Sequence, residues 1–416
     1  MTSPFLATVL VLSACSGSSG EESATVPDEP SAAVASDPAA EPAEAKGATE
    51  ALEATPTAGG TLIARTNVQA SGNRYLPGSL DLSQEPTTIE LPFTALWVLP
   101  VDDGSVIVVG NDGSALAVGP DGSTTALDPV DPNVAPLAYE RDGEIVLVPN
   151  TLGVDSDLPD ASIVSDDGIS AWYDGATERV PHGALGDTIE STRLVIVRAV
   201  INPKNAASGS LADEDLIVVD LEDDPSQPVF EGLTPLLADV DGDGEVDVLT
   251  TISDRDGGAR LAVFGANGEL IAESEPIGRG NRWRHQIAVA PTGPNGEVEV
   301  IEVQTPHIGG LLQFQRLEGT ALSLQFQVGE FRSHVLSSRN LDGAVVFDGD
   351  GDGQPEAIVP TQSLDAIAVV DGEPADGGPM LIDLGGATVS SNLALGEIDT
   401  GLRFAVALND GRLLLW

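Results

Sequence analysis

The chain has 416 residues and a formal net charge of −48, from 66 acidic and 18 basic residues, which excludes nucleic acid and anionic membrane surfaces as binding partners. Hydrophobic residues make up 41% of the chain, enough for a sizeable core, whereas aromatic residues make up only 4%. The 46 glycines and 29 prolines favour many short elements joined by turns.

The N-terminus has features of an export signal. Residues 5–12 (FLATVLVL) form an apolar run that is too short for a stable membrane span, and they lead into the sequence LSAC, which ends at Cys15. Cys15 is the only cysteine, so no intrachain disulfide can form. The LSAC sequence resembles the lipobox of bacterial lipoproteins. The resemblance implies that residues 1–15 are a signal peptide, that Cys15 is lipidated, and that Ser16 is compatible with the outer membrane of a Gram-negative cell envelope.

Two alternatives to this interpretation stay open at the N-terminus. The basic residues expected before the apolar run of a signal peptide are absent, so either the true start lies further upstream or the match is chance. Residues 16–58 contain nine acidic residues, one lysine and no aromatic residue. Because such a segment cannot bury enough apolar area to offset the entropy of ordering, we expect a disordered acidic tether.

Residues 59–416 predict β-strands throughout. Residues 95–128 contain Asp-Gly pairs at 103, 112 and 121, a nine-residue spacing with short apolar runs between the pairs. Asp-Gly supplies the positive φ angles of tight hairpins, so this stretch predicts a four-stranded antiparallel meander. No long segment has a convincing 3.6-residue periodicity. We therefore predict an all-β domain over residues 59–416.

A repeated four-stranded meander is the unit of a β-propeller, and the length of this domain corresponds to about seven blades, with six and eight as alternatives. Residues 403–416 predict a hairpin that ends the chain on a strand. We expect the early strand at residues 61–67 to complete this last blade and remove its open edge. The rival architecture is a pair of β-sandwiches, which requires a linker near the middle of the chain, and no such linker is evident.

Two acidic segments share one pattern, D-x-D-x-D-G followed by an acidic residue three positions later. Alternate side chains of a tightly curled loop converge on one point, and this number of oxygen ligands suits Ca²⁺. The EF-hand pattern fails because Thr250 and Val359 occupy the twelfth position and the flanks are strand-like. We predict two structural Ca²⁺ sites, with acidic turns that leave the metal out as the alternative. The candidate ligands, with Glu245 and Gln354 acting through their carbonyls, are Asp239, Asp241, Asp243, Glu245, Asp247, Asp348, Asp350, Asp352, Gln354 and Glu356.

An acidic loop that leads directly into a strand, repeated in an all-β domain, resembles the FG-GAP/VCBS repeat family, which includes the integrin α-subunit propeller. Residues 261–270 (LAVFGANGEL), with Phe264-Gly265, are similar to the motif that names the family. The resemblance covers about residues 235–416 and implies loops that join neighbouring strands of a blade and bind stabilising Ca²⁺. Residues 396–406 occupy a comparable place in the last blade but lack the ladder of alternating aspartates.

Residues 279–339 differ from the rest of the chain, because six arginines face only five glutamates and three of the four histidines fall there. We expect a less acidic face that binds a protein or glycan ligand. The alternative is a connection whose charges are merely solvated, and the spacing of the histidines matches no compact metal motif. The candidate residues are Trp283, Arg284, His285, His307, Arg332 and His334.

The sequence therefore predicts an exported, lipid-anchored propeller that acts as a binding or scaffold module at the cell surface. It contains no nucleophile elbow, P-loop, dinucleotide fingerprint or H-E-x-x-H motif, so we expect a binding protein rather than an enzyme. The alternative is an envelope enzyme, a lyase or hydrolase acting on polysaccharide. Its site would comprise Arg284, His285, His307 and His334, and it requires these side chains to meet.

Overall fold

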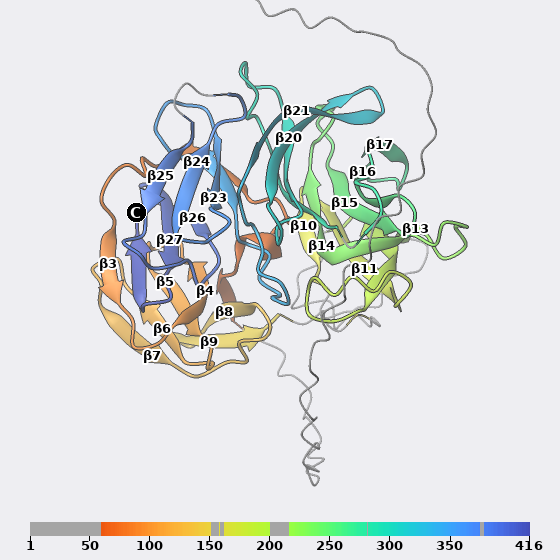
Figure 1. Cartoon of the computed structure of the whole chain (residues 1–416). Helices are drawn as coiled ribbons and strands as arrows, with labels where there is room; N and C mark the ends of the chain where they lie inside the picture. The colour runs from red at the N-terminus through yellow and green to blue at the C-terminus, as the bar shows by residue number, and fades with distance from the viewer. Residues whose placement is uncertain (1–59, 151–157, 159–161, 200–215, 281, 375–377) are drawn as a thin grey trace, which may run out of the picture. The chain divides into compact units, whose positions relative to one another are not determined.

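The computed structural model describes residues 60–150, 158, 162–199, 216–280, 282–374 and 378–416 (Figure 1). Residues 56–416 form one compact unit. The predictions for the signal peptide, for Cys15 and for the tether lie outside the described residues.

Almost all of the described elements are strands, and consecutive strands pair antiparallel in groups of up to four. The groups are β4 (Ala95–Pro100), β5 (Val106–Gly110), β6 (Ala115–Val118) and β7 (Thr124–Leu127); β8 (Pro136–Arg141) and β9 (Glu144–Pro149); β10 (Val164–Asp166), β11 (Ile169–Thr177), β12 (Glu190–Val197) and β13 (Leu216–Asp220); β14 (Val229–Ala238), β15 (Asp247–Asp254), β16 (Gly258–Phe264) and β17 (Leu270–Ser274); β18 (Arg284–Ala290), β19 (Glu299–Gln304), β20 (Leu311–Glu318) and β21 (Ala321–Gly329); β22 (Val345–Asp348), β23 (Glu356–Pro360), β24 (Ala366–Val370) and β25 (Met380–Asp383); and β26 (Ala394–Ile398), β27 (Gly401–Ala407) and β28 (Arg412–Leu415).

This repetition of antiparallel meanders makes the chain an all-β propeller, as predicted. The meander expected at residues 95–128 is confirmed as β4–β7, with the predicted Asp-Gly pairs at its three turns. In the β4–β7 meander every residue of β5 is buried, whereas β7 at the outer edge is mostly exposed. The core lies between neighbouring groups, where for example Phe347 of β22 packs against Phe404 of β27.

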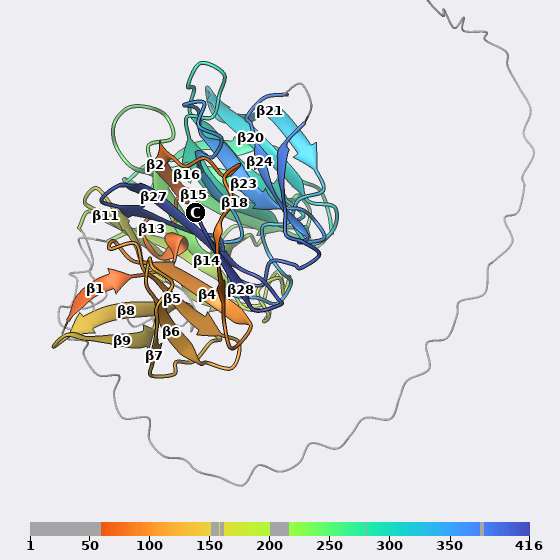
Figure 2. The same ribbon diagram turned by 90° about the vertical axis from the view of Figure 1, so that its left-hand side faces the viewer.

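The N-terminal strands join three different groups of the propeller. Strand β3 (Thr87–Glu90) pairs antiparallel with β28, the last strand of the chain, so an N-terminal strand does complete the last group. The expectation that residues 61–67 would do this is wrong, because β1 (Thr61–Ala64) pairs with β8 instead (Figure 2). Strand β2 (Tyr75–Ser79) pairs parallel with β22. The segment between β1 and β2 lies inside the domain. The segment after β2 contains β3, which completes the last strand group.

That inner stretch, residues 66–74, contains the 3-10 helix η1 (Asn67–Gln69) and connects six strand groups through hydrogen bonds. Each hydrogen bond reaches a residue in the first strand of a group or just before it. Side chains of the segment bond to the backbones of Leu395, Ala135 and Val289. Its backbone carbonyls accept the amides of Ser165, Leu237 and Val346. The Asn392 side chain similarly accepts the amide of Val98 in β4 and donates to the carbonyl of Val98. We call residues 66–74 the hub segment.

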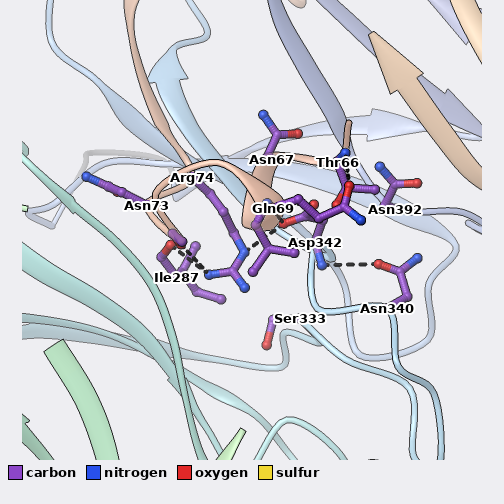
Figure 3. Close-up of polar contacts among 12 residues, drawn as sticks. Thr66, Asn67, Gln69, Asn73, Arg74, Ile287, Ser333, Asn340, Asp342 and Asn392 are labelled. Carbon is purple, nitrogen blue, oxygen red and sulfur yellow. Dashed lines mark hydrogen bonds and ion pairs between the residues drawn. The ribbon is translucent and has the colours of Figure 1, made fainter. Parts of the chain in front are cut away.

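A buried ion pair fixes the hub segment (Figure 3). The Arg74 guanidinium donates from Nε to Asp342 at 2.9 Å, and the two side chains are 3% and 0% exposed. Nη1 of Arg74 donates to three backbone carbonyls, those of Gly72, Gln286 and Ile287. Both carboxylate oxygens of Asp342 also accept the Val68 amide, at 2.9 Å. The pair therefore satisfies groups on three segments that are far apart in sequence.

Candidate functional site

The two acidic loops occupy equivalent places in the fold. One joins β14 to β15 and the other joins β22 to β23, so each connects the first and second strands of its group, with the β18–β21 group between them. The β26–β27 hairpin, which lacks the aspartates, holds the same place in the last group, as expected.

The backbone of the two loops is folded by the same hydrogen bonds. The first aspartate of each loop, Asp239 or Asp348, accepts two glycine amides at 2.7 and 3.0 Å. The last carboxylate, Asp247 or Glu356, accepts the amide of the residue that follows the first aspartate, at 3.0 and 2.7 Å. The glycines adopt positive φ angles, for example 87° at Gly244, a conformation that side chains disfavour.

These bonds bring most of the predicted ligands together. Carboxylate oxygens of Asp348, Asp350, Asp352 and Glu356 lie within 4.8 Å of one another, as do those of Asp239, Asp241 and Asp247 in the first loop. Asp243 is outside the first cluster, and the Glu245 side chain pairs with Arg198 at 3.7 Å. Gln354 donates its backbone amide to Asp352.

The electrostatics of both clusters favour a cation. Burial, together with the neighbouring aspartates, raises the pKa of Glu356 to about 8 and that of Asp247 to about 6. Concentrated, partly desolvated carboxylates repel one another, and a hard divalent cation relieves that repulsion. An all-oxygen donor set on a glycine-bent loop could hold a hard divalent metal ion.

The predicted ligand face gathers its aromatic residues into one cluster. The Trp283 indole stacks on His285 with ring centroids 4.7 Å apart, and it lies 6.2 Å from His307 and 5.1 Å from His334. His307 Nε2 and His334 Nδ1 are 2.7 Å apart, and His334 Nε2 donates to the Ser338 carbonyl. Since that carbonyl can only accept, a neutral His334 accepts at Nδ1 and His307 donates from Nε2.

Burial keeps this cluster uncharged at neutral pH. It lowers the pKa of His307 to about 4 and that of His334 to about 3, with smaller contributions from neighbouring positive groups. The pKa of His285 is also lowered by burial and by the Arg74 charge. Nδ1 of His285 forms a hydrogen bond with the Ser333 hydroxyl at 2.8 Å. Nε2 of His285 is buried and has no hydrogen-bond partner among the described residues.

The six candidate residues do not all face one ligand. Arg284 lies outside the cluster. Its guanidinium forms a buried ion pair with Glu302 and donates to the Glu275 carbonyl. His285 and His334 are only 1% and 3% exposed, so neither reaches a ligand in this structure. Arg332 keeps a buried Nε without a partner. Of the four residues named for an enzyme, His307 and Arg284 line cavities, but these are two different cavities, so the four side chains do not converge on one.

His182 is a further site residue that sequence reasoning missed. Its Nδ1 atom lies 2.8 Å from the Glu231 carboxylate, which also accepts the Ser253 hydroxyl at 2.5 Å. Nearby, burial and then the Glu231 charge raise the pKa of Glu190 to about 10, so Glu190 is protonated at neutral pH. His182 is 152 residues before His334, and no local pattern links the two. The only sequence feature that could have indicated its role is that the chain has just four histidines.

A cleft runs past the exposed side of the cluster. One part, of about 290 Å³, is lined by His182, Arg282, Trp283, Gln304, Thr305, His307 and Ile308. A second part, of about 320 Å³, shares His182 and Arg282 and continues to Glu231, Ser253, Asp254 and Arg255. Because neighbouring strands are antiparallel, the β15–β16 and β19–β20 loops that form this cleft lie at the opposite strand ends from the acidic loops.

Exposed aliphatic side chains flank this cleft. Ile308 is 82% exposed, Leu336 is 59% exposed and Val335 is 47% exposed. They lie on the two loops that the His307–His334 contact joins, directly beside those histidines in sequence. We call Ile308, Val335 and Leu336 the loop patch. Three large apolar side chains are therefore exposed on one pair of loops.

Comparison with known proteins shows neither a family nor a function for the chain. No family model and no curated protein matches the chain. Among solved structures, the chain is similar to BBS1N in complex with ARL6DN (14% identity, covering 80% of this chain and 95% of that one, TM-score 0.44). It is also similar to the Cps50 (Swd1) β-propeller domain of Myceliophteria thermophila (11% identity, covering 79% and 98%, TM-score 0.42). In the described part of the chain, no helix is long and apolar enough to cross a membrane.

Proposed function

We propose that this protein is a binding module whose propeller presents the loop patch and the adjoining cleft to a protein partner. The observation that carries the proposal is the exposure of Ile308, Val335 and Leu336 on two loops that the buried histidine cluster fixes. An aliphatic surface on a rigid scaffold is typical of protein contact sites, because burying it on association removes apolar area from water.

A protein fits this surface better than a glycan does. Trp283 is the only tryptophan at the cleft, and it is 3% exposed and stacked on His285, so it offers no open ring face for a sugar. The enzyme alternative is less favoured, because His285 and His334 are buried and Arg284 is engaged with Glu302.

The architecture we propose has seven blades, one for each strand group, with β3 closing the last blade and the hub segment inside. Two Ca²⁺ ions bound by the acidic loops would brace the blades that contain β14–β17 and β22–β25. This is a structural role, since these loops lie at the strand ends opposite the loop patch. The export and anchoring of the domain through a lipidated Cys15, at the cell envelope, complete the proposal.

A comparative capture experiment tests the partner surface. Purified domain is immobilised as wild type, as an Ile308→Ser/Leu336→Ser double variant and as Leu381→Ser, and each is incubated with envelope extract. Leu381 is a matched control because it is 58% exposed on β25, away from the loop patch. A partner should be retained by wild type and by Leu381→Ser and lost from the double variant. Equal retention by all three would contradict the proposed surface.

A further inference from the structure

We infer that the cleft beside the loop patch is a carboxylate site, which takes an aspartate or glutamate side chain of the protein partner between Arg282, Arg255, His182 and His307. The inference rests on the proposed function and adds the chemistry of the partner: an acidic residue next to an apolar one. Ile308 connects the two features, because it is both the most exposed large apolar residue of the described chain and a lining residue of the cleft.

The first observation is the state of the arginines. In a chain with 66 acidic residues, ten of the described arginines form ion pairs with carboxylates. Arg255 and Arg282 both line the cleft, both are exposed, and within the described residues neither has a carboxylate at ion-pair distance. Two unneutralised guanidiniums at one cleft of a strongly acidic protein form a site for an anion.

The arginines are held in place by backbone contacts. Arg255 donates from Nε and Nη2 to the Arg179 carbonyl, at 3.0 and 2.8 Å. Arg282 donates from Nη1 to the Ile277 carbonyl at 3.2 Å. Each guanidinium thus uses a main-chain acceptor for orientation and keeps further N–H groups for a ligand. Its five donors make a fork that matches the two oxygens of a carboxylate.

The carboxylates that line the cleft are already engaged. Glu231 accepts from His182 and from the Ser253 hydroxyl, and it is 3% exposed. Asp254 forms an ion pair with Arg260 at 3.1 Å. Neither neutralises Arg255 or Arg282. Arg255 and Arg282 therefore keep N–H donors for an anion, and Arg282 and His182 line both parts of the cleft.

The four histidines of the chain supply the probe for a test, because all of them lie in this cleft or in the cluster beneath it. Protein labelled with ¹⁵N only in histidine gives four imidazole spin systems, one for each histidine, which His→Gln variants assign. The folded domain is titrated with N-acetyl-glutamate methylamide and, separately, with N-acetyl-glutamine methylamide, its uncharged match. We expect saturable shifts of the His182 and His307 signals with the glutamate probe only. The buried His285 and His334 signals report whether each variant remains folded.

The variants decide the assignment. Arg282→Gln should weaken binding of the glutamate probe at least 10-fold, as expected for loss of a charge-assisted hydrogen bond. Arg412→Gln, which removes an arginine paired with Asp410 far from the cleft, should bind as wild type does. Equal shifts with both probes, tighter binding of inorganic phosphate than of the glutamate probe, or unchanged binding by Arg282→Gln would overturn the carboxylate site. These results leave the capture experiment unaffected, so failure of this site and failure of the loop patch are separate outcomes.

Discussion

The hub ion pair gives the strongest stability prediction. Replacing Asp342 by asparagine keeps the shape of the side chain but leaves the Arg74 guanidinium charged and without a counter-ion. Both side chains are almost fully buried, and removing one partner of such a pair costs about 3–5 kcal/mol. The reciprocal change, Arg74→Met, leaves the Asp342 carboxylate alone and removes donors from three backbone carbonyls, so we expect a cost at the upper end of that range.

The melting temperature converts this cost into a measurable shift. A folded part of roughly 350 residues has an unfolding entropy of about 0.75 kcal/mol/K, so the loss corresponds to a decrease of about 4–7 °C. Differential scanning calorimetry measures it, with Arg412→Met as the matched control. The Arg412–Asp410 pair has a similar distance, 2.8 Å, but is 27% and 42% exposed, and an exposed pair contributes about 0–1 kcal/mol.

A double-mutant cycle separates the pair from its surroundings. Arg74→Met combined with Asp342→Asn removes both charges, so its cost should be clearly less than the sum of the two single costs. An Asp342→Asn variant that melts within 1 °C of the Arg412→Met control would refute the role of this pair. So would costs in the double variant that are simply additive.

Three further outcomes are expected. Removal of calcium with a chelator should lower the melting temperature, by about 4 °C for each site if free Ca²⁺ was initially at 100 times the dissociation constant of that site. The double variant Asp241→Ala/Asp350→Ala should abolish this effect. An unchanged melting temperature in wild type would refute the calcium sites. The folded-state pKa values of His307 (about 4) and His334 (about 3) are below the unfolded value of about 6.5, so the unfolded chain takes up protons first and stability is lost as the pH falls below 6.5. At pH 5 the loss is about 2 kcal/mol for the buried His334, and it is smaller for the half-buried His307 because solvent screens its charge. Urea denaturation of wild type and His334→Gln should show the wild-type advantage shrinking by that amount between pH 7.5 and pH 5; a difference that does not vary with pH would count against neutral burial of His334. Cys15→Ala should release the protein from the membrane fraction of the expressing cell, and persistent membrane attachment would argue against lipidation.

Local patterns predicted the features that depend on neighbouring residues. The Asp-Gly spacing of residues 95–128 predicted the β4–β7 meander, since a tight turn with a glycine at positive φ and alternating side chains set the register of a hairpin. The acidic ladders similarly gave two loops with equivalent bonds, because each ladder folds on its own backbone amides.

Features built from distant segments were predicted only in part. We predicted that residues 61–67 pair with the last strand of the chain, whereas β3 does so and β1 pairs with β8. Several N-terminal stretches have a strand-like composition, and composition alone does not indicate which of them pairs with β28. Arg284 and His285 are neighbours in β18, so their side chains point to opposite faces, and only His285 joins the cluster.

By itself, the sequence determined an all-β chain with propeller rhythm and two acidic loops, because turn chemistry, side-chain alternation and ligand spacing are properties of short segments. The tertiary structure decided which charges are neutralised and which surfaces remain open. It placed His182 beside His307 across 125 residues of chain and buried Arg74 against Asp342. Among the described residues, it left Arg255 and Arg282 without a carboxylate at ion-pair distance, in a cleft that the exposed Ile308 also lines. Charge pairing and burial depend on how distant strands pack, and that packing is not encoded in any single stretch of residues.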